Sequence, residues 1–408
     1  MSEDKNRYHQ GEGEAFDFQL PSRLFGNKNV LKCIDCHAGG EPARVVLSGV
    51  KLPSKHKTAL QKRAYMMEHL DHLRKLLLLE PRGYPCQNVN FIFPPTTPGG
   101  NLQYVIGEQN KIYPLMSGHN TICVATALLE TGVVPMLEPT TQFTLEAPAG
   151  PIEITAKCQD GKALSVALKN APSFVERLDV VVDVQHDNIG KVTCDIAYGG
   201  MWYCVVNLEQ FQQHDTLTLS QKRLASKLTL DPNLAGELCR IGEMIKVACR
   251  EQFPVQHPDP NIDYPGVDIL VFREASQRQT DSEGVEVVRA RNTVVMSNNV
   301  LEWDKPETWT AMLDRSPCGT GTCAVMAVMH AKGELKVGER FEHESIVGAK
   351  FIGTILEETS IAEGADKKTK RVAILPQVEG SGYITQYSEV VVDPLDPFPE
   401  GYRVGDIW

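Results

Sequence analysis

Hydrophobic and polar positions alternate along much of the chain in the pattern of short, half-buried strands. A dense run of such segments fills residues 141–195, where Gly, Pro, Asp and Asn separate one apolar stretch from the next. Further strand-like segments read VLKCID from Val30, ARVVLSGV, NVNFIF, VDILVF, EVVRARNTVVMS, AKFIGTILEET and RVAILPQ. Strands are therefore expected to make up most of the regular structure.

Two segments show the spacing of three to four residues that is typical of an amphipathic helix. Residues 57–79 place apolar side chains at Leu60, Ala64, Met67, Leu70, Leu73 and Leu77. Residues 232–250 follow Asp231 and begin with Pro232, an N-cap residue and a proline in the first helical turn. Many strands with a few embedded helices indicate the α+β class.

Two glycine-containing segments about 200 residues apart resemble each other. Residues 116–132 read MSGHNTICVATALLETG, and residues 317–333 read PCGTGTCAVMAVMHAKG. In this alignment Ser117 stands opposite Cys318, and each segment continues from a glycine turn into helix-forming residues that end in glycine. The repeat predicts two similar lobes, each with one such helix.

Composition and charge narrow the function classes. The chain has 408 residues, 42% of them hydrophobic, and a formal net charge of −11, which suit a globular protein of two or three domains. The negative charge without a basic patch argues against nucleic-acid binding. No apolar run reaches the ~20 residues of a membrane span, and the N-terminus lacks the apolar core of a signal peptide. We therefore expect a cytoplasmic protein without membrane attachment. Its eleven scattered cysteines are expected to be free thiols.

Cys318 and Ser117 are the candidate reactive groups, because each precedes the first turn of a predicted helix. Unpaired N–H groups at a helix start bind anions and lower the pKa of a cysteine thiol. Cys318 is therefore the best thiolate candidate, whereas the Ser117 hydroxyl is a weaker base that needs a neighbour such as His119. Two such helix ends facing each other would stabilise the charge that develops when a small carboxylic acid loses its Cα proton. Asp314 could anchor a substrate amine, so the sequence predicts proton transfer at the Cα of an amino acid, without a cofactor.

Some of these residues also have purely structural interpretations. Ser117 could serve only as an N-cap residue. Cys33 and Cys36 form a CxxC pair, but without a second pair they are expected to be structural cysteines of a strand. His37 and Glu41, in the HAGGEP turn, either border the cleft or stabilise the turn.

The segments IDCHAGGEPARVV, LEPRG, MSGHNT, DIAYGG, DRSPCGTGTCA and DPFPEG resemble the proline racemase superfamily. This superfamily includes proline racemases, 4-hydroxyproline 2-epimerases and trans-3-hydroxy-L-proline dehydratases, and the resemblance covers residues 30–408. It implies the fold of diaminopimelate epimerase, in which two pseudo-symmetric lobes each wrap a sheet around a central helix and the active site lies between them. We expect an N-terminal extension at 1–28, a first lobe at 29–190 completed by 375–408, and a second lobe at 191–374.

The resemblance also implies roles for individual residues. Ser117 and Cys318 would be the two acid–base residues, and Asp314 would bind the ring nitrogen. The donors to the substrate carboxylate would be Gly118, His119, Gly319 and Thr320. No metal or cofactor is implied. Racemases and many epimerases of the family have cysteine where this chain has Ser117, and dedicated dehydratases usually have threonine at the second position. The Ser–Cys variant is associated with hydroxyproline 2-epimerase and trans-3-hydroxyproline dehydratase activities.

The unequal pair guides the expected function. The serine hydroxyl is a poor proton carrier, so proton transfer on one face of Cα is expected to be less effective. Dehydration of 3-hydroxyproline needs only one strong base and modest acid assistance. We therefore expect dehydration of trans-3-hydroxy-L-proline to a pyrroline-2-carboxylate, with 2-epimerisation of 3- or 4-hydroxyproline as the alternative or as a second activity. Isomerisation of a longer acid and a non-catalytic amino-acid-binding paralogue are the remaining alternatives. The expected partner is a small hydroxyproline, and a homodimer is compatible with the family.

Overall fold

The computed structural model describes residues 30–405, apart from 187–188, 213–217, 219–221, 223, 225, 261, 263, 282–283, 299 and 364–368. The expected extension at 1–28 lies outside the described residues. Strands outnumber helices in the described part of the chain, and the predicted α+β class is confirmed. None of the described helices is long and apolar enough to cross a membrane.

The helices are α1 (Ala59–His69), α2 (Asp71–Leu78), α3 (Gly118–Glu130), α4 (Leu208–Gln212), α6 (Ala235–Gln252) and α7 (Gly319–Ala331), with 3₁₀ turns η2 (Gln109–Lys111), η3 (Pro232–Leu234) and η4 (Pro306–Thr308). The strands of the first half are β1 (Val30–Ala38), β2 (Glu41–Ser48), β3 (Asn88–Phe93), β4 (Leu102–Gly107), β5 (Thr140–Ala147), β6 (Gly150–Gln159), β7 (Lys162–Lys169), β8 (Phe174–Val184) and β9 (Gly190–Tyr198). The strands of the second half are β10 (Trp202–Asn207), β11 (Ile269–Arg273), β12 (Gln277–Thr280), β13 (Glu286–Ser297), β14 (Ala311–Asp314), β15 (Arg340–Glu344), β16 (Lys350–Glu363), β17 (Thr369–Gly380) and β18 (Gly382–Val391).

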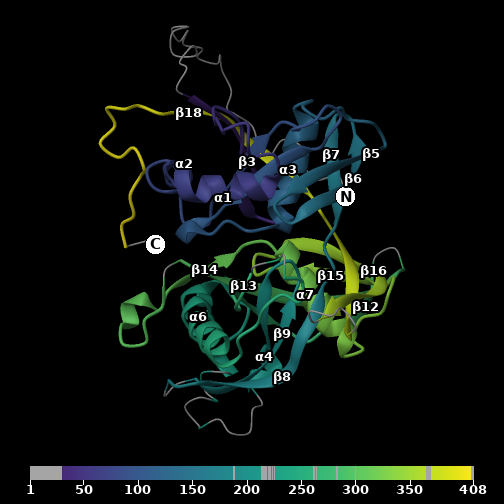
Figure 1. Cartoon of the computed structure of the whole chain (residues 1–408). Helices are drawn as coiled ribbons and strands as arrows, with labels where there is room; N and C mark the ends of the chain where they lie inside the picture. Colours follow the sequence, from purple (N-terminus) through teal and green to yellow (C-terminus); the bar gives the residue numbers. More distant parts are fainter. Residues whose placement is uncertain are drawn as a thin grey trace, which may run out of the picture.

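The chain forms two lobes, each with one helix in its centre (Figure 1). In the upper lobe the strands follow the order β18-β1-β2-β3-β4-β5-β6-β7 and surround α3. In the lower lobe β8 to β11 and β13 to β17 surround α7, and α6 covers the outer face of β11 and β13. The expected arrangement of two lobes, each with a sheet wrapped around a central helix, is confirmed.

The chain passes between the lobes twice, and the two passing segments are paired with each other. The Asn170 N–H donates to the Pro376 carbonyl at 2.9 Å, and the Ser173 N–H donates to the Ile374 carbonyl at 2.9 Å. β8, which follows, pairs with β9 in the lower lobe. We therefore propose that the first lobe ends near residue 170 rather than at 190. The expected return near residue 375 falls within β17, and this boundary stays a prediction.

Three further expectations concern two helices and the C-terminal segment. The helix predicted at 57–79 is broken into α1 and α2 at Leu70, whose ψ of 16° ends α1. The C-terminal segment contacts the first lobe, because Tyr402 forms a β-bridge with Glu80 and Asp396 pairs with Arg82, although its side chains Leu395, Phe398 and Val404 are exposed. The predicted helix at 232–250 is present as η3 followed by α6.

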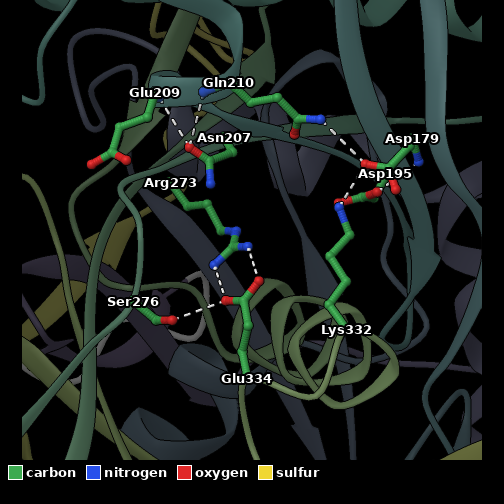
Figure 2. Close-up of polar contacts among 9 residues, drawn as sticks. All are labelled: Asp179, Asp195, Asn207, Glu209, Gln210, Arg273, Ser276, Lys332 and Glu334. Carbon is green, nitrogen blue, oxygen red and sulfur yellow. Dashed lines mark hydrogen bonds and ion pairs between the residues drawn. The ribbon is translucent and has the colours of Figure 1, made fainter. Parts of the chain in front are cut away.

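Charged side chains fix the C-terminal end of α7 to the surrounding strands (Figure 2). The guanidinium of Arg273, which is only 1% exposed, donates two hydrogen bonds of 3.0 Å to the carboxylate of Glu334, just beyond α7. Lys332 lies 2.8 Å from Asp179 on β8 and 2.9 Å from Asp195 on β9. Cys318 is the N-cap residue at the other end of this helix.

We predict that Glu334→Gln lowers the free energy of unfolding by about 2–3 kcal/mol, because it leaves the buried Arg273 guanidinium without its counter-charge. The matched control is Glu339→Gln, which breaks the more exposed Arg278–Glu339 pair and is expected to cost less than about 1 kcal/mol. Denaturant unfolding measures both variants. Equal losses of unfolding free energy in Glu334→Gln and Glu339→Gln would show that the Arg273–Glu334 pair does not anchor the end of α7.

Candidate active site

The N-terminal ends of α3 and α7 meet between the lobes. Both helices have 13 residues, and each is followed by a glycine with positive φ, 74° at Gly132 and 73° at Gly333. A Cβ atom built on Gly118 would lie 2.5 Å from the Cα of Gly319, closer than real side chains approach. The internal repeat predicted from the sequence is thus present as two equivalent helices whose first residues touch.

Cys318 lies at the start of α7 in a strained backbone conformation. Its φ of 64° is in the left-handed region, which residues other than glycine rarely adopt. A chain of buried hydrogen bonds holds it there, because the Cys318 N–H donates to Ser316 Oγ at 3.0 Å and the Ser316 N–H donates to Asp314 Oδ1 at 2.7 Å. Asn292 Nδ2 donates to the Pro317 carbonyl at 2.9 Å. Strain of this kind is typical of functional sites.

The thiol of Cys318 faces hydrogen-bonding partners on the first turn of α7 and on β10. Its Sγ accepts from the Gly321 N–H at 3.4 Å and lies 3.4 Å from the hydroxyl of Tyr203, which is also 2.6 Å from Thr320 Oγ1. Burial and the nearby Asp314 carboxylate raise the pKa of Cys318. The sequence-based expectation of a lowered pKa is therefore wrong for the structure as it stands, since desolvation of an 8%-exposed thiol outweighs the helix start.

Ser117 occupies the N-cap position of α3, but its side chain makes no capping hydrogen bond. Its Oγ instead accepts from Asn120 Nδ2 at 3.0 Å and lies 3.3 Å from His119 Nδ1. Burial lowers the pKa of His119 to about 3, so its ring is neutral at ordinary pH. Asn88 Nδ2 lies 3.2 Å from His119 Nε2, and with the Asn88 amide in this orientation the ring hydrogen is assigned to Nδ1, facing Ser117. In that tautomer two N–H groups face the Ser117 oxygen, an arrangement that would make the hydroxyl a better proton donor than acceptor.

Three carboxyl groups, the buried Glu41 and Asp314 and the half-buried Glu108, lie close enough to interact with one another. Burial raises the pKa of Asp314 to about 6 and that of Glu108 to about 8, and the pKa of the fully buried Glu41 is also raised by burial and by Asp314. Glu41 Oε2 accepts from the Arg315 N–H at 2.8 Å, whereas its Oε1 has no hydrogen-bond partner. Such a group of acids is stabilised by a shared proton or by a cation.

The residues that the sequence singled out therefore lie together, buried at the two helix starts. They are Ser117, Gly118, His119, Asp314, Cys318, Gly319 and Thr320. Two of the expected carboxylate donors already have other hydrogen-bonding partners in the structure. The ring of His119 contacts Asn88, and the hydroxyl of Thr320 contacts Tyr203. Their roles toward a substrate stay a proposal.

Sequence reasoning missed Tyr203, Glu108 and Asn120. Tyr203 gave a weak signal, as a tyrosine within the apolar strand segment WYCVV; Asn120 lies within the segment MSGHNT but was assigned no role, and Glu108 gave no signal. The sequence allows two interpretations of Glu41. Its bond to the Arg315 N–H joins the turn of the first lobe to the Cys318 loop of the second, so it contacts the site rather than only its own turn. Cys33 and Cys36 are buried on β1, which agrees with the structural interpretation.

Comparisons with known proteins show the family of this chain. A "4-hydroxyproline 2-epimerase" of Rhizobium etli is 35% identical over 93% of this chain and 97% of its own. The crystal structure of a "probable proline racemase" from Agrobacterium radiobacter K84, with bound carbonate, has a TM-score of 0.74 at 34% identity and covers 93% of this chain and 98% of its own. A hydroxyproline epimerase from Agrobacterium vitis, with bound trans-4-hydroxy-L-proline, has a TM-score of 0.74 at 31% identity over 93% of this chain and 96% of its own. Residues 33–403 match the proline racemase family model, and the chain belongs to that family.

Proposed function

We propose that the protein removes and returns the Cα proton of a hydroxyproline, with Cys318 on one face of Cα and Ser117 on the other. The observation that carries the proposal is the contact between Gly118 and Gly319, which brings both residues to one point between the lobes. The N–H groups of the two helix starts would stabilise the enolate-like charge that forms on the substrate carboxylate. Both reactive side chains are less than a tenth exposed, so substrate entry would require the lobes to open.

Asp314 supplies the proposed site for the ring nitrogen. A protonated secondary amine beside Asp314 would neutralise the carboxylate that raises the pKa of Cys318, so substrate binding would itself ease loss of the thiol proton. The thiolate would then take the Cα proton, and the Ser117 hydroxyl, held by Asn120 and His119, would deliver a proton from the opposite face.

The relatives favour 2-epimerisation of 4-hydroxyproline as the outcome of this chemistry. The Rhizobium etli relative carries that activity in its name, and the Agrobacterium vitis structure holds trans-4-hydroxy-L-proline. Similarity over more than nine-tenths of both chains supports a shared substrate class. The sequence alone put dehydration first, and these relatives move epimerisation ahead of it.

Dehydration of trans-3-hydroxy-L-proline remains the second candidate because of the surroundings of Ser117. A hydroxyl whose oxygen accepts from Asn120 Nδ2, and from His119 Nδ1 in the assigned tautomer, is a good acid and a poor base. Epimerisation in both directions requires each residue to act as base once, whereas elimination requires one base and one acid. An enzyme with this pair is therefore suited to expel the 3-hydroxyl as water, leaving a pyrroline-2-carboxylate.

Incubation of the purified protein with 4-hydroxy-, 3-hydroxy- and unsubstituted L-proline in deuterated water tests the proposal. We expect deuterium at Cα with inversion of 4-hydroxyproline, and a pyrroline-2-carboxylate from 3-hydroxyproline if the second activity is present. Tight binding without deuterium uptake would identify a non-catalytic binding protein. Rapid racemisation of proline with inert hydroxyprolines would overturn the substrate assignment.

The ionisation of Asp314 sets the expected pH dependence. With its pKa raised to about 6, Asp314 is neutral below that pH and cannot hold a cationic substrate nitrogen. We therefore predict that kcat/KM rises with pH through about 6. Asp314→Asn should lose this limb of the profile and lower kcat/KM about 100-fold or more. A wild-type profile that stays flat between pH 5 and about 7 would exclude Asp314 from this role.

A further inference from the structure

Three cysteines converge in the core of the second lobe, away from the helix starts described above. They are Cys194 on β9, Cys204 on β10 and Cys249 on α6, and they are 1%, 0% and 0% exposed. Their three Sγ atoms lie within 4.8 Å of one another, and no other group of His, Cys, Asp and Glu side chains in the described residues meets this distance. The catalytic proposal does not use any of them.

The backbone explains why the three thiols meet. In the antiparallel pair of β9 and β10, Cys204 stands opposite Ile196, so Cys194 lies two residues along on the same face of the sheet. The helix α6 packs on this lobe and brings Cys249 to that face. All three belong to an apolar cluster that also contains Val192, Val206 and Ile245, and that does not include Cys318.

We propose that this cluster is a binding site for a trivalent thiophilic ion of the arsenic(III) class, held by the three sulfurs. With a sulfur–ion distance of ~2.3 Å, as for a zinc thiolate, three sulfurs around one ion stand about 4 Å or less apart. The sulfurs are already within 4.8 Å, so small side-chain movements would bring them to bonding positions. The inference does not rest on the proposed function.

Charge selects a trivalent ion over the commoner divalent ones. Three thiolates around a divalent ion leave one net negative charge, and three thiolates around a monovalent ion leave two negative charges. Such an unpaired charge is costly in an apolar core. The cations of α6 nearest to Cys249 in sequence are already engaged, Lys246 with Glu243 and Arg250 with Asp268. A trivalent ion with three thiolates is neutral and suits an apolar site.

The binding step is an exchange of ligands without a change in oxidation state. Arsenite, As(OH)₃, reacts with three thiols, so that three As–O bonds break and three As–S bonds form. The three thiol protons leave with the three hydroxides as water, and arsenic stays trivalent throughout. Access requires transient opening of the lobe, so binding should be slow at low temperature.

Native mass spectrometry of the reduced, full-length protein with inorganic arsenite tests the proposal. Three-thiol binding adds one arsenic and removes three hydrogens, whereas a two-thiol site retains one hydroxyl and removes two hydrogens. We expect the three-hydrogen loss, once per chain, and a thermal midpoint that rises with arsenite concentration.

Variants identify the sulfurs. Cys204→Ala and Cys249→Ala should each weaken arsenite binding at least tenfold and abolish the three-hydrogen adduct. The control Cys158→Ala removes a buried cysteine of the first lobe, 3% exposed, and should leave both unchanged. The proposal is overturned if the wild-type protein binds no arsenite or if the bound arsenic retains a hydroxyl. It is also overturned if the Cys158→Ala variant loses the adduct, or if zinc or cadmium binds with loss of three hydrogens while arsenite does not. Because the hydrogen count is read on the wild type, the test holds even if a core variant fails to fold.

Discussion

Cys318→Ala is expected to lower exchange of the substrate Cα proton with deuterated water by at least about 10³-fold, while the protein stays folded. The thiol is the only strong acid–base group among the residues that begin α7, and its Sγ lies 3.4 Å from the Tyr203 hydroxyl and accepts from the Gly321 N–H. Alanine removes the sulfur without adding volume. The loss should therefore appear in kcat rather than in KM.

The matched control is Cys323→Ala, which removes a second buried thiol one turn further along α7. Cys323 is 1% exposed and belongs to the core rather than to the helix start. We expect it to change kcat less than about tenfold and to lower stability by about 1 kcal/mol. Unchanged deuterium uptake in Cys318→Ala would move the base elsewhere and would contradict the proposed mechanism.

Gly118→Ala is expected to lower kcat/KM by about 100-fold or more, although it adds only one methyl group and removes no reactive atom. The added Cβ would lie 2.5 Å from the Cα of Gly319, a backbone atom that cannot rotate away. The two helix starts would have to separate by about 1 Å, a displacement that is enough to misplace a proton donor and acceptor. The unfolding free energy should fall by about 1–3 kcal/mol.

Gly236→Ala serves as the control for this substitution. Gly236 lies in the first turn of α6, and a Cβ there would meet nothing within 4 Å. We expect normal activity and unchanged or slightly raised stability, because alanine is the better helix former. Full activity of Gly118→Ala would show that the exact contact between the helices does not position the reaction.

The candidate site was largely predictable because its main residues lie in two short, repeated segments. Ser117 and Cys318 each precede a glycine and a run of helix formers, and local sequence is enough to predict such a helix start. The structure has both helices at the predicted positions and with the same length. The break between α1 and α2 was missed, because the spacing of apolar residues runs through Leu70 without interruption.

The partners of these residues were not predictable in the same way. Tyr203 reaches Cys318 from a strand 115 residues earlier, and Glu41 reaches the Arg315 N–H across 274 residues. The local signals at these two positions are weak, because a tyrosine in an apolar strand and a glutamate in a turn are common in any protein. Only the packing of one lobe against the other makes them neighbours of the site.

The sequence by itself determined the class of fold, the two helix starts and the unequal Ser–Cys pair, because these follow from residues close together along the chain. The tertiary structure decided the ionisation of the site. A helix start alone lowers the pKa of a cysteine, yet burial beside Asp314 raises that of Cys318. The pKa depends on how much water and which charges surround the sulfur, and long-range packing sets both.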